Sequence, residues 1–288
     1  MIRSLWIAKT GLDSQQTSLD VITNNLANAQ TTAFKRLRPV FSELLYQNLR
    51  ANGLAQGEDR GNPGAGGVPM PPGASATGYI AIPAGLSIGA GAQVIATQRI
   101  NSQGQVVRTD NPLDLAIKGL GYFRVSTSTA PSPNNFAYTR AGTFMRDNAG
   151  NIVTANGHYL LDDADNLINV PADADSIVVA EDGTVTYYQG DPLVPIFAGK
   201  VGLYTFSNPA GLNNGGSDLY YETQASGVAN PGTGGVGGFG SLLQYYTEQS
   251  NVNIAEELVG LIAAQRAYEI TTRSISASDS LLQKLSTI

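Results

Sequence analysis

The sequence lacks cysteine entirely, and its 288 residues include only one histidine, His158. Without cysteine the chain can form no disulfide, no thiolate nucleophile and no cysteine ligand for a metal. A single histidine also argues against a metal site built from several imidazoles. A cysteine-free composition suits both the cytosol and an exported protein that avoids oxidation, so it leaves the compartment open.

The sequence also lacks a long apolar run and any basic run. The stretch from Leu5 to Ala8 is soon followed by Lys9 and Asp13, so it is too short for the apolar part of a cleaved signal peptide. No segment approaches the roughly 18 apolar residues of a membrane helix. Lysine and arginine number 17 against 23 acidic residues, and the net charge of −6 does not favour nucleic-acid binding. If the protein is exported, we expect export without a cleaved signal peptide.

Both ends of the chain carry apolar residues at helical spacing. Leucine recurs every seven residues from Leu5, and a second position follows three residues after each leucine, as in the a and d positions of a coiled coil. Gln15 is the one polar layer of this seam. The predicted seam residues are Leu5, Ala8, Leu12, Gln15, Leu19, Ile22 and Leu26 near the N-terminus, and Ile254, Leu258, Leu261, Ala264, Tyr268, Ile275, Leu282 and Leu285 near the C-terminus.

These terminal helices need a partner. Ordering one residue of backbone costs about 1–2 kcal/mol, and single helices gain most of their stability from packing an apolar face. The partner is either the other end of the same chain or identical segments of other copies. The first reading gives a two-helix hairpin that caps one globular domain, and the second gives a coiled-coil surface for polymerisation. The periodicity alone does not choose between them.

The middle of the chain is rich in glycine and alternates like β-strands. Ile177 and Val179 precede the turn Asp182–Gly183, and alternation resumes at Val185, which predicts a hairpin. We therefore predict an α+β fold, in which paired N- and C-terminal helices form a coiled coil and a mostly antiparallel β domain is inserted between them. The expected boundaries are 1–50 and 242–288 for the helical core, 51–94 and 207–241 for Gly/Pro-rich linking segments with some extended structure, and 95–206 for the β domain.

Two local signals refine the ends of the helices. Pro39 should break the first helix, and the apolar spacing in 41–49 predicts a second helical patch after it. Asn251 or Asn253 is a predicted N-cap of the last helix, because two glutamates follow at positions 256 and 257, where the helix dipole favours negative charge.

Two short patterns could carry chemistry, but their surroundings are wrong. Gly85–Gly89 matches the nucleophile elbow G-x-S-x-G around Ser87, yet an elbow needs a helix after it and β-branched sequence follows here. The cluster at 162–166 fails as a calcium loop, because Ile168 and Ala174 stand where Gly and Glu are required. We predict no catalytic residue, no cofactor and no metal site. A secreted serine hydrolase is kept as an alternative.

The chain resembles a known family at both ends and in the middle. Segment 4–13 (SLWIAKTGLD) and the asparagines Asn24, Asn25 and Asn28 resemble the start of the axial proteins of the bacterial flagellum, which are its rod, hook and hook-associated subunits. Segments 250–253 (SNVN) and 265–269 (QRAYE) resemble the end of these proteins, and 114–119 and 138–144 resemble their β segments. The resemblance covers almost the whole chain and is weak only at 51–83.

The resemblance implies a structural protein rather than an enzyme. The Trp6 opening and the short stretch after 265–269 favour a subunit of the distal rod, with a proximal rod or hook subunit as the alternative. Such subunits leave through the flagellar type III export apparatus and assemble as a homo-oligomer into a helical, tubular drive shaft. The implied location is the basal body, in the rod that crosses the periplasm. The implied partners are proximal rod subunits, hook protein and the ring proteins that act as a bushing, without nucleic acid or membrane insertion.

The resemblance also marks interface residues and departures. It adds Asn24, Asn25 and Asn28 to the predicted interface, and it implies that the stretch from about 34 to 91 stiffens the rod. Relatives usually have glycine where this chain has Ala33, and commonly asparagine where it has Gly260. A glycine inside the predicted helix should cost about 0.8–1 kcal/mol relative to alanine.

Overall fold

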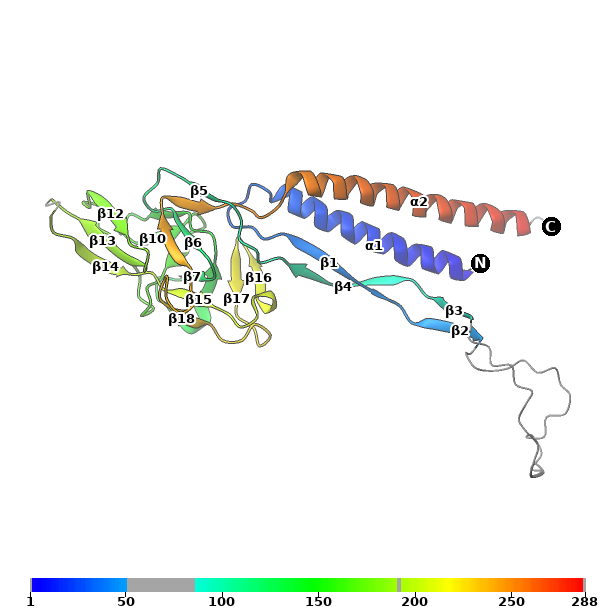
Figure 1. The fold of residues 1–288 in the computed structure, drawn as a ribbon, viewed down its shortest axis with the longest axis horizontal. Coiled ribbons are helices and arrows are strands. Elements are labelled where there is room, and N and C mark those ends of the chain that lie inside the picture. The colour runs from blue at the N-terminus through cyan, green and yellow to red at the C-terminus, as the bar shows by residue number, and fades with distance from the viewer. Residues whose placement is uncertain (1, 51–85, 191–192, 287–288) are drawn as a thin grey trace, which may run out of the picture. The chain divides into compact units, whose positions relative to one another are not determined.

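The computed structural model describes residues 2–50, 86–190 and 193–286 (Figure 1). The described residues form two compact units. One comprises those within Met1–Thr17, Val40–Ala96 and Gln265–Ile288, and the other those within Ser18–Pro39 and Thr97–Ala264. Most of the Gly/Pro-rich segment expected at 51–94 lies outside the described residues.

Helix α1 (Ile2–Ala27) and helix α2 (Ile254–Ser286) stand at the two ends of the chain, as predicted. Within the first unit, Gly11 faces Thr271, and within the second, Gly260 faces Ile22, so the helices run antiparallel. Asn253 is the N-cap of α2, because its side-chain Oδ1 accepts a hydrogen bond of 3.1 Å from the backbone N–H of Ala255.

Helix α1 ends earlier than expected. It stops at Ala27, well before Pro39, in a turn where the Asn28 N–H still donates to the Asn24 carbonyl. Ala33 then adopts a left-handed φ of 59° and is only 1% exposed. This conformation is one that glycine adopts without cost, so the turn has a physical reason to prefer glycine at position 33.

The helical patch predicted at 41–49 is wrong. Residues Leu37–Glu43 form strand β1 and Tyr46–Arg50 form strand β2, which pair with β4 (Ala92–Arg99) and β3 (Leu86–Gly89) as two-stranded ribbons. Spacing that suits a helix is ambiguous in a segment this short, and pairing with a second strand decides the outcome.

The main sheet has nine antiparallel strands in the order β16-β17-β8-β7-β11-β10-β9, and β15 pairs with both β7 and β18. The strands are β7 (Tyr122–Ser126), β8 (Phe136–Thr139), β9 (Phe144–Arg146), β10 (Ile152–Thr154), β11 (Tyr159–Leu160), β15 (Leu203–Thr205), β16 (Asn213–Gly216), β17 (Leu219–Tyr221) and β18 (Asn230–Gly232). Short 3-10 turns lie at Pro133–Asn135 and Pro209–Gly211. Residues 207–241, expected as a linking segment, therefore supply three strands of this sheet.

Smaller sheets complete the second unit. The predicted hairpin is confirmed, since β12 (Ser176–Val179) pairs with β13 (Thr184–Tyr188), and β14 (Ile196–Lys200) adds a third strand. Strands β5 (Val106–Arg108) and β6 (Leu115–Lys118) pair with β20 (Tyr246–Glu248) and β19 (Ser241–Gln244). Residues 242–248, which the sequence-based prediction placed with the helical end, thus join the β region before α2 begins.

Two buried clusters hold the second unit together. The larger is mostly aliphatic and includes Leu160 and Val185, together with the aromatic Phe123. The smaller is aromatic and places Tyr138 and Phe206 edge to face with ring centroids 4.9 Å apart. Edge-to-face pairs of this kind add about 0.5–1.5 kcal/mol beyond the apolar area that they bury.

Candidate functional site

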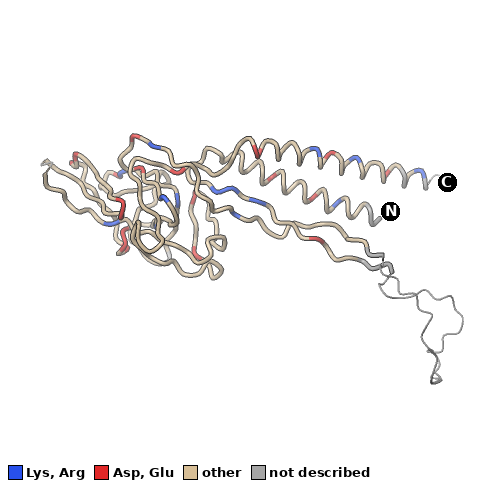
Figure 2. Tube along the Cα trace, viewed as in Figure 1, with Lys and Arg blue, Asp and Glu red and all other residues tan. Residues whose placement is uncertain are grey.

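A short basic segment, 35–38, follows α1 and leads into β1 (Figure 2). Lys35 and Arg36 point into different polar clusters, both within the second unit. We call these contacts together the polar junction; its other members are Asn25, Arg140, Glu248, Asn251 and Glu257. The junction connects the second half of α1 and the start of α2 to the β strands.

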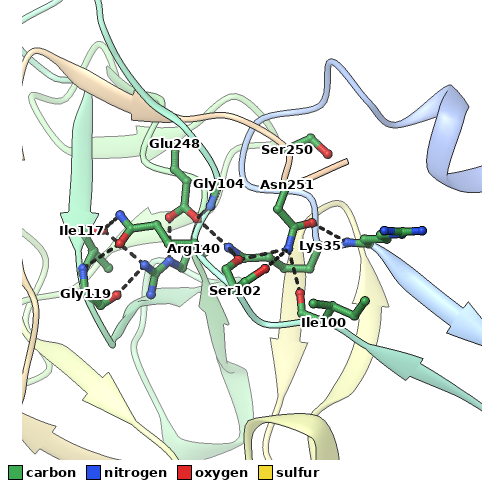
Figure 3. Close-up of polar contacts among 12 residues, drawn as sticks. Lys35, Ile100, Ser102, Gly104, Ile117, Gly119, Arg140, Glu248, Ser250 and Asn251 are labelled. Carbon is green, nitrogen blue, oxygen red and sulfur yellow. Dashed lines mark hydrogen bonds and ion pairs between the residues drawn. The ribbon is translucent and has the colours of Figure 1, made fainter. Parts of the chain in front are cut away.

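Glu248 of β20 is the centre of the first cluster (Figure 3). Its Oε1 lies 2.5 Å from Lys35 Nζ, and its Oε2 lies 2.7 Å from Arg140 Nε. The backbone N–H of Gly104 also donates to Oε1, over 2.9 Å. The Glu248 side chain is fully shielded from solvent and that of Lys35 is 4% exposed, so the two charges have no water to compensate them. A buried charge is tolerated when it is paired and hydrogen-bonded, as this one is.

The remaining N–H donors of the Arg140 guanidinium bind backbone carbonyls. Its Nη1 donates to Gly121 over 2.7 Å, and its Nη2 donates to Gly119 over 2.6 Å and to Ile117 over 3.2 Å. Lys35 likewise donates to the Ser102 carbonyl over 2.9 Å. The cluster therefore fastens the segment after α1 to the turn between β6 and β7 through one glutamate.

Burial and charge oppose each other at this cluster. Burial lowers the pKa of Lys35, and the hydrogen bond and charge of Glu248 offset this only in part. Burial raises the pKa of Glu248, but the neighbouring Arg140 and Lys35 together lower it below its ordinary value. Glu248 therefore stays ionised between two cations.

Asn25 organises the second cluster. Its Nδ2 donates to the Leu37 carbonyl over 2.8 Å, and its Oδ1 accepts from the Leu37 N–H over 2.9 Å. The same Nδ2 lies 3.2 Å from Glu257 Oε2, and Glu257 Oε1 lies 2.6 Å from Arg36 Nε. Asn25 and Glu257 are 1% and 2% exposed, so α1, β1 and α2 are joined by a buried amide and a buried carboxylate.

Asn251 continues the polar junction toward β4. Its Oδ1 accepts from the Arg36 N–H over 2.7 Å, and its Nδ2 donates to the carbonyls of Ile100 and Ser102 over 2.9 Å and 3.0 Å. One amide thus satisfies three backbone groups of two segments before α2 begins (Figure 3).

The predicted seam residues occupy several environments. The N-terminal set, Leu5, Ala8, Leu12, Gln15, Leu19, Ile22 and Leu26, is half-buried throughout. On α2, Ala264 is buried and Leu261, Tyr268 and Ile275 are half-buried, whereas Ile254 and Leu258 are 46% and 43% exposed. The side chains of Leu282 and Leu285 lie outside the described residues. Asn24 is exposed, Asn25 is buried and Asn28 is half-buried.

The sequence did not point to the face of α1 that is most buried. Ser14, Val21 and Asn25 lie on one side of the helix and are shielded, while the seam lies on another. The sequence also did not single out Lys35, Arg140 or Glu248. A usable signal existed at Arg140, since a charged residue directly after an apolar strand is buried only when it is paired.

The patterns examined for chemistry have structural roles or no chemical context. Strand β3 is followed by β4 rather than by a helix, so the elbow arrangement around Ser87 is absent from the described region. Asp162 closes a turn by accepting from the N–H groups of Ala164 and Asn166. Across residues 2–50, 86–190 and 193–286, no group of three His, Cys, Asp or Glu could hold a metal. Over the same part of the chain, neither helix is long and apolar enough to cross a membrane.

Three family models match the chain. Residues 5–35 match the flagella basal body rod protein model, residues 116–187 match the D1 domain of the flagellar hook protein FlgE/F/G model, and residues 243–288 match the C-terminal model of the flagellar basal body rod FlgEFG proteins. The three matches cover α1, the core of the main sheet and α2, which are the elements joined by the polar junction.

The curated relatives are similar along their whole length. The chain is 42% identical over 286 residues to the flagellar basal-body rod protein FlgG of Buchnera aphidicola from Acyrthosiphon pisum, covering 99% of both chains. It is 38% identical to the protein of that name in Caulobacter vibrioides, over 99% of this chain and 98% of the relative. It is 35% identical to the one in Bacillus subtilis, over 99% and 98%. With this identity over full length, the chain belongs to the family of flagellar basal-body rod proteins.

Proposed function

We propose that this chain is a structural subunit of the distal part of the flagellar rod, and that copies assemble through their terminal helices into a helical tube that transmits torque. The relatives that carry the name FlgG support the rod assignment. In this proposal the chain has no catalytic role and needs no cofactor.

The observation that carries the proposal is an uncovered apolar face on α2. Val259, Ile262 and Ile270 are 68%, 50% and 67% exposed. They lie on the side opposite Tyr268, since nine residues from Val259 to Tyr268 make about two and a half helical turns. The side of α2 that faces α1 is therefore separate from this face. Apolar side chains at helical spacing that remain exposed in one copy are suited to packing against another helix.

This exposed face supports a coiled-coil contact between copies in addition to the pairing of the two helices within one copy. We propose that α1 and α2 pair in one copy through the half-buried seam, and that the outer face of α2 adds the coiled-coil contact between copies. The outer face and its acceptor on the next copy are different surfaces. Contacts between different surfaces give rings or open helical filaments, and a rod requires the latter.

The polar junction supports the mechanical part of the proposal. Torque passed between helices and β strands needs a connection that does not bend, and buried, mutually paired charges with fixed hydrogen-bond partners provide one. Asn25 and Glu248 each bind groups from at least two other segments. We propose that proximal rod subunits, hook protein, ring proteins and the type III export apparatus are its partners, by analogy with the family.

Hydrogen exchange tests the assembly directly. Backbone amides are followed in dilute monomer and in assembled material over 3–29 and 252–286. The proposal expects that protection of the α2 amides rises on assembly, because packing between copies suppresses local opening of the helix, while protection of the main sheet stays unchanged as the internal control. Equal, strong protection of both helices in monomer and at high concentration, without polymer, would identify a capped monomeric domain instead.

A further inference from the structure

A cavity of about 410 Å³ lies beside the second half of α1. The polar residues that line it include Asp20 and Asn24 of α1, Lys35 after α1, Arg99 at the end of β4, and Ser217 and Asp218 in the turn between β16 and β17. Tyr220 forms part of the apolar wall. All of these residues belong to the second unit.

Asp20, Asp218 and part of Arg99 lack a hydrogen-bonding partner among the residues that the structure describes. Asp218 is half-buried, and neither its carboxylate nor that of Asp20 has a hydrogen-bond or ion-pair partner among the described residues. Arg99 stacks on the Tyr220 ring with its guanidinium 4.3 Å from the centroid, and its Nη1 is buried with no acceptor in the described part of the chain. Burial also raises the pKa of the Asp218 carboxyl, as expected for an acid without a cation.

Asp218 is held at the cavity by a backbone conformation that residues with a Cβ rarely adopt. Ser217 and Asp218 have φ values of 53° and 60°, so two successive residues with side chains are left-handed. Hairpin turns of this shape normally use asparagine and glycine. The fold therefore maintains an unpaired carboxylate at this position against local conformational cost.

The mixture of charges limits what can bind. A bare cation would be repelled by Arg99, and a bare anion would be repelled by the two aspartates. A polypeptide segment carries both a basic side chain and carbonyl acceptors, and so matches the wall. This chain itself supplies such segments, because Arg108, Lys118 and Arg266 are exposed and their side chains have no ion-pair or hydrogen-bond partner among the described residues.

We propose that the cavity receives a segment of a second copy of this chain, with a lysine or arginine side chain between Asp20 and Asp218 and a backbone carbonyl accepting from Arg99. This inference rests on the proposed self-assembly and adds a second subunit contact, distinct from the outer face of α2. It assigns an intermolecular role to Asp20, Arg99 and Asp218.

Crosslinking identifies the occupant. Because the chain has no cysteine, Ser217→Cys creates a single thiol at the rim of the cavity that accepts a maleimide photocrosslinker. Polymer is formed from this variant mixed with isotope-labelled wild type, irradiated and analysed by mass spectrometry. We expect crosslinks to a labelled peptide that contains lysine or arginine. Crosslinks confined to the same copy, or none, overturn the inference.

A second cysteine variant distinguishes failure of the cavity inference from failure of the proposed function. Val259→Cys places the same crosslinker on the outer face of α2. If polymer forms and Val259→Cys crosslinks between copies while Ser217→Cys does not, only the cavity inference is wrong. If no polymer forms under any condition, the proposed function fails as well.

Removing the two carboxylate charges tests whether they contribute to assembly. The double variant Asp20→Asn/Asp218→Asn should raise the critical concentration for assembly by at least about tenfold, since unpairing a charge that is buried on binding weakens complexes strongly. The matched control Asp163→Asn/Asp173→Asn removes the same charge from exposed positions elsewhere in the second unit. Equal critical concentrations for the two double variants contradict the inference.

Discussion

The ammonium group of Lys35 lies 2.5 Å from a carboxylate oxygen of Glu248, and both side chains are buried. Glu248 also holds Arg140, so one carboxylate balances two cations that come from distant parts of the sequence. The segment that follows α1 is fixed to the β strands by this arrangement, and the first cluster of the polar junction depends on that one glutamate.

Glu248→Gln should strongly destabilise the protein. The amide leaves Lys35 and Arg140 buried without a counter-charge, and breaking a buried pair typically costs about 3–5 kcal/mol. Chemical denaturation of the monomer measures the loss. Glu256→Gln is the matched control, because Glu256 pairs with Arg36 at 3.3 Å with its side chain 60% exposed, and an exposed pair contributes about 0–1 kcal/mol. Similar losses in the two variants would contradict the role given to Glu248.

Stability should fall on acidification in a way that depends on Glu248. Its pKa in the folded protein is below the ordinary value of 4.5, because Arg140 and Lys35 outweigh the effect of burial. The unfolded chain therefore binds the proton first, and the stabilisation present above pH 4.5 is lost as the pH falls through the lower, folded pKa. The difference between wild type and Glu248→Gln, measured by denaturation across this range, should shrink with falling pH. A constant difference would rule out this linkage.

Gly260→Ala should stabilise the monomer. A Cβ at this position would lie 3.6 Å from Ile22 Cδ1, which is ordinary van der Waals contact, and alanine is favoured over glycine in a helix by about 0.8–1 kcal/mol. Thermal unfolding followed by circular dichroism measures the gain. Gly91→Ala is a contrasting control, since a Cβ there would overlap Thr10 and the glycine has a φ of 115°. A loss of stability at Gly260→Ala would show that α1 and α2 pack more closely than described.

Ala33→Gly should stabilise the turn after α1. A left-handed conformation costs a residue with a Cβ about 1–2 kcal/mol, so glycine removes this strain from the folded chain. Glycine also gives the unfolded chain more conformational freedom, which offsets about 0.4–1 kcal/mol of the gain. We expect a net gain of up to about 1 kcal/mol in denaturant unfolding. Ala29→Gly, nearby in the same connection, lacks the positive φ and should give no gain. A destabilised Ala33→Gly would mean that packing of the buried methyl outweighs the backbone strain.

Ile262→Ser should reduce assembly without weakening the monomer. Ile262 is 50% exposed on the outer face of α2, so serine removes a contact surface that one copy does not use. Sedimentation of polymer against monomer gives the change in critical concentration, and denaturation gives monomer stability. Leu261→Ser, one residue away on the half-buried side, should lower monomer stability as well. Unchanged assembly in Ile262→Ser would contradict the outer-face contact.

The sequence by itself determined the features that local chemistry dictates. The apolar spacing at both ends predicted α1 and α2, Asn251 or Asn253 with the glutamates after them predicted where α2 starts, and the Asp182–Gly183 turn predicted the β12–β13 hairpin. These signals depend on residues within a few positions of one another, so they can be recognised from the sequence alone. The resemblance to flagellar axial proteins was likewise carried by short contiguous motifs.

Only the tertiary structure decided the rest. Residues 37–43 and 46–50 form strands because other strands pair with them, although the apolar spacing at 41–49 suggested a helix. Lys35 and Glu248 are separated by 213 residues, so no local pattern shows that each supplies the counter-charge that lets the other be buried. The buried face of α1 includes Ser14, whose hydroxyl donates to the Thr10 carbonyl of its own helix, and Asn25, whose amide is satisfied by the Leu37 backbone and Glu257. Burial of polar groups is set by partners distant in sequence, and those partners are known only once the chain is folded.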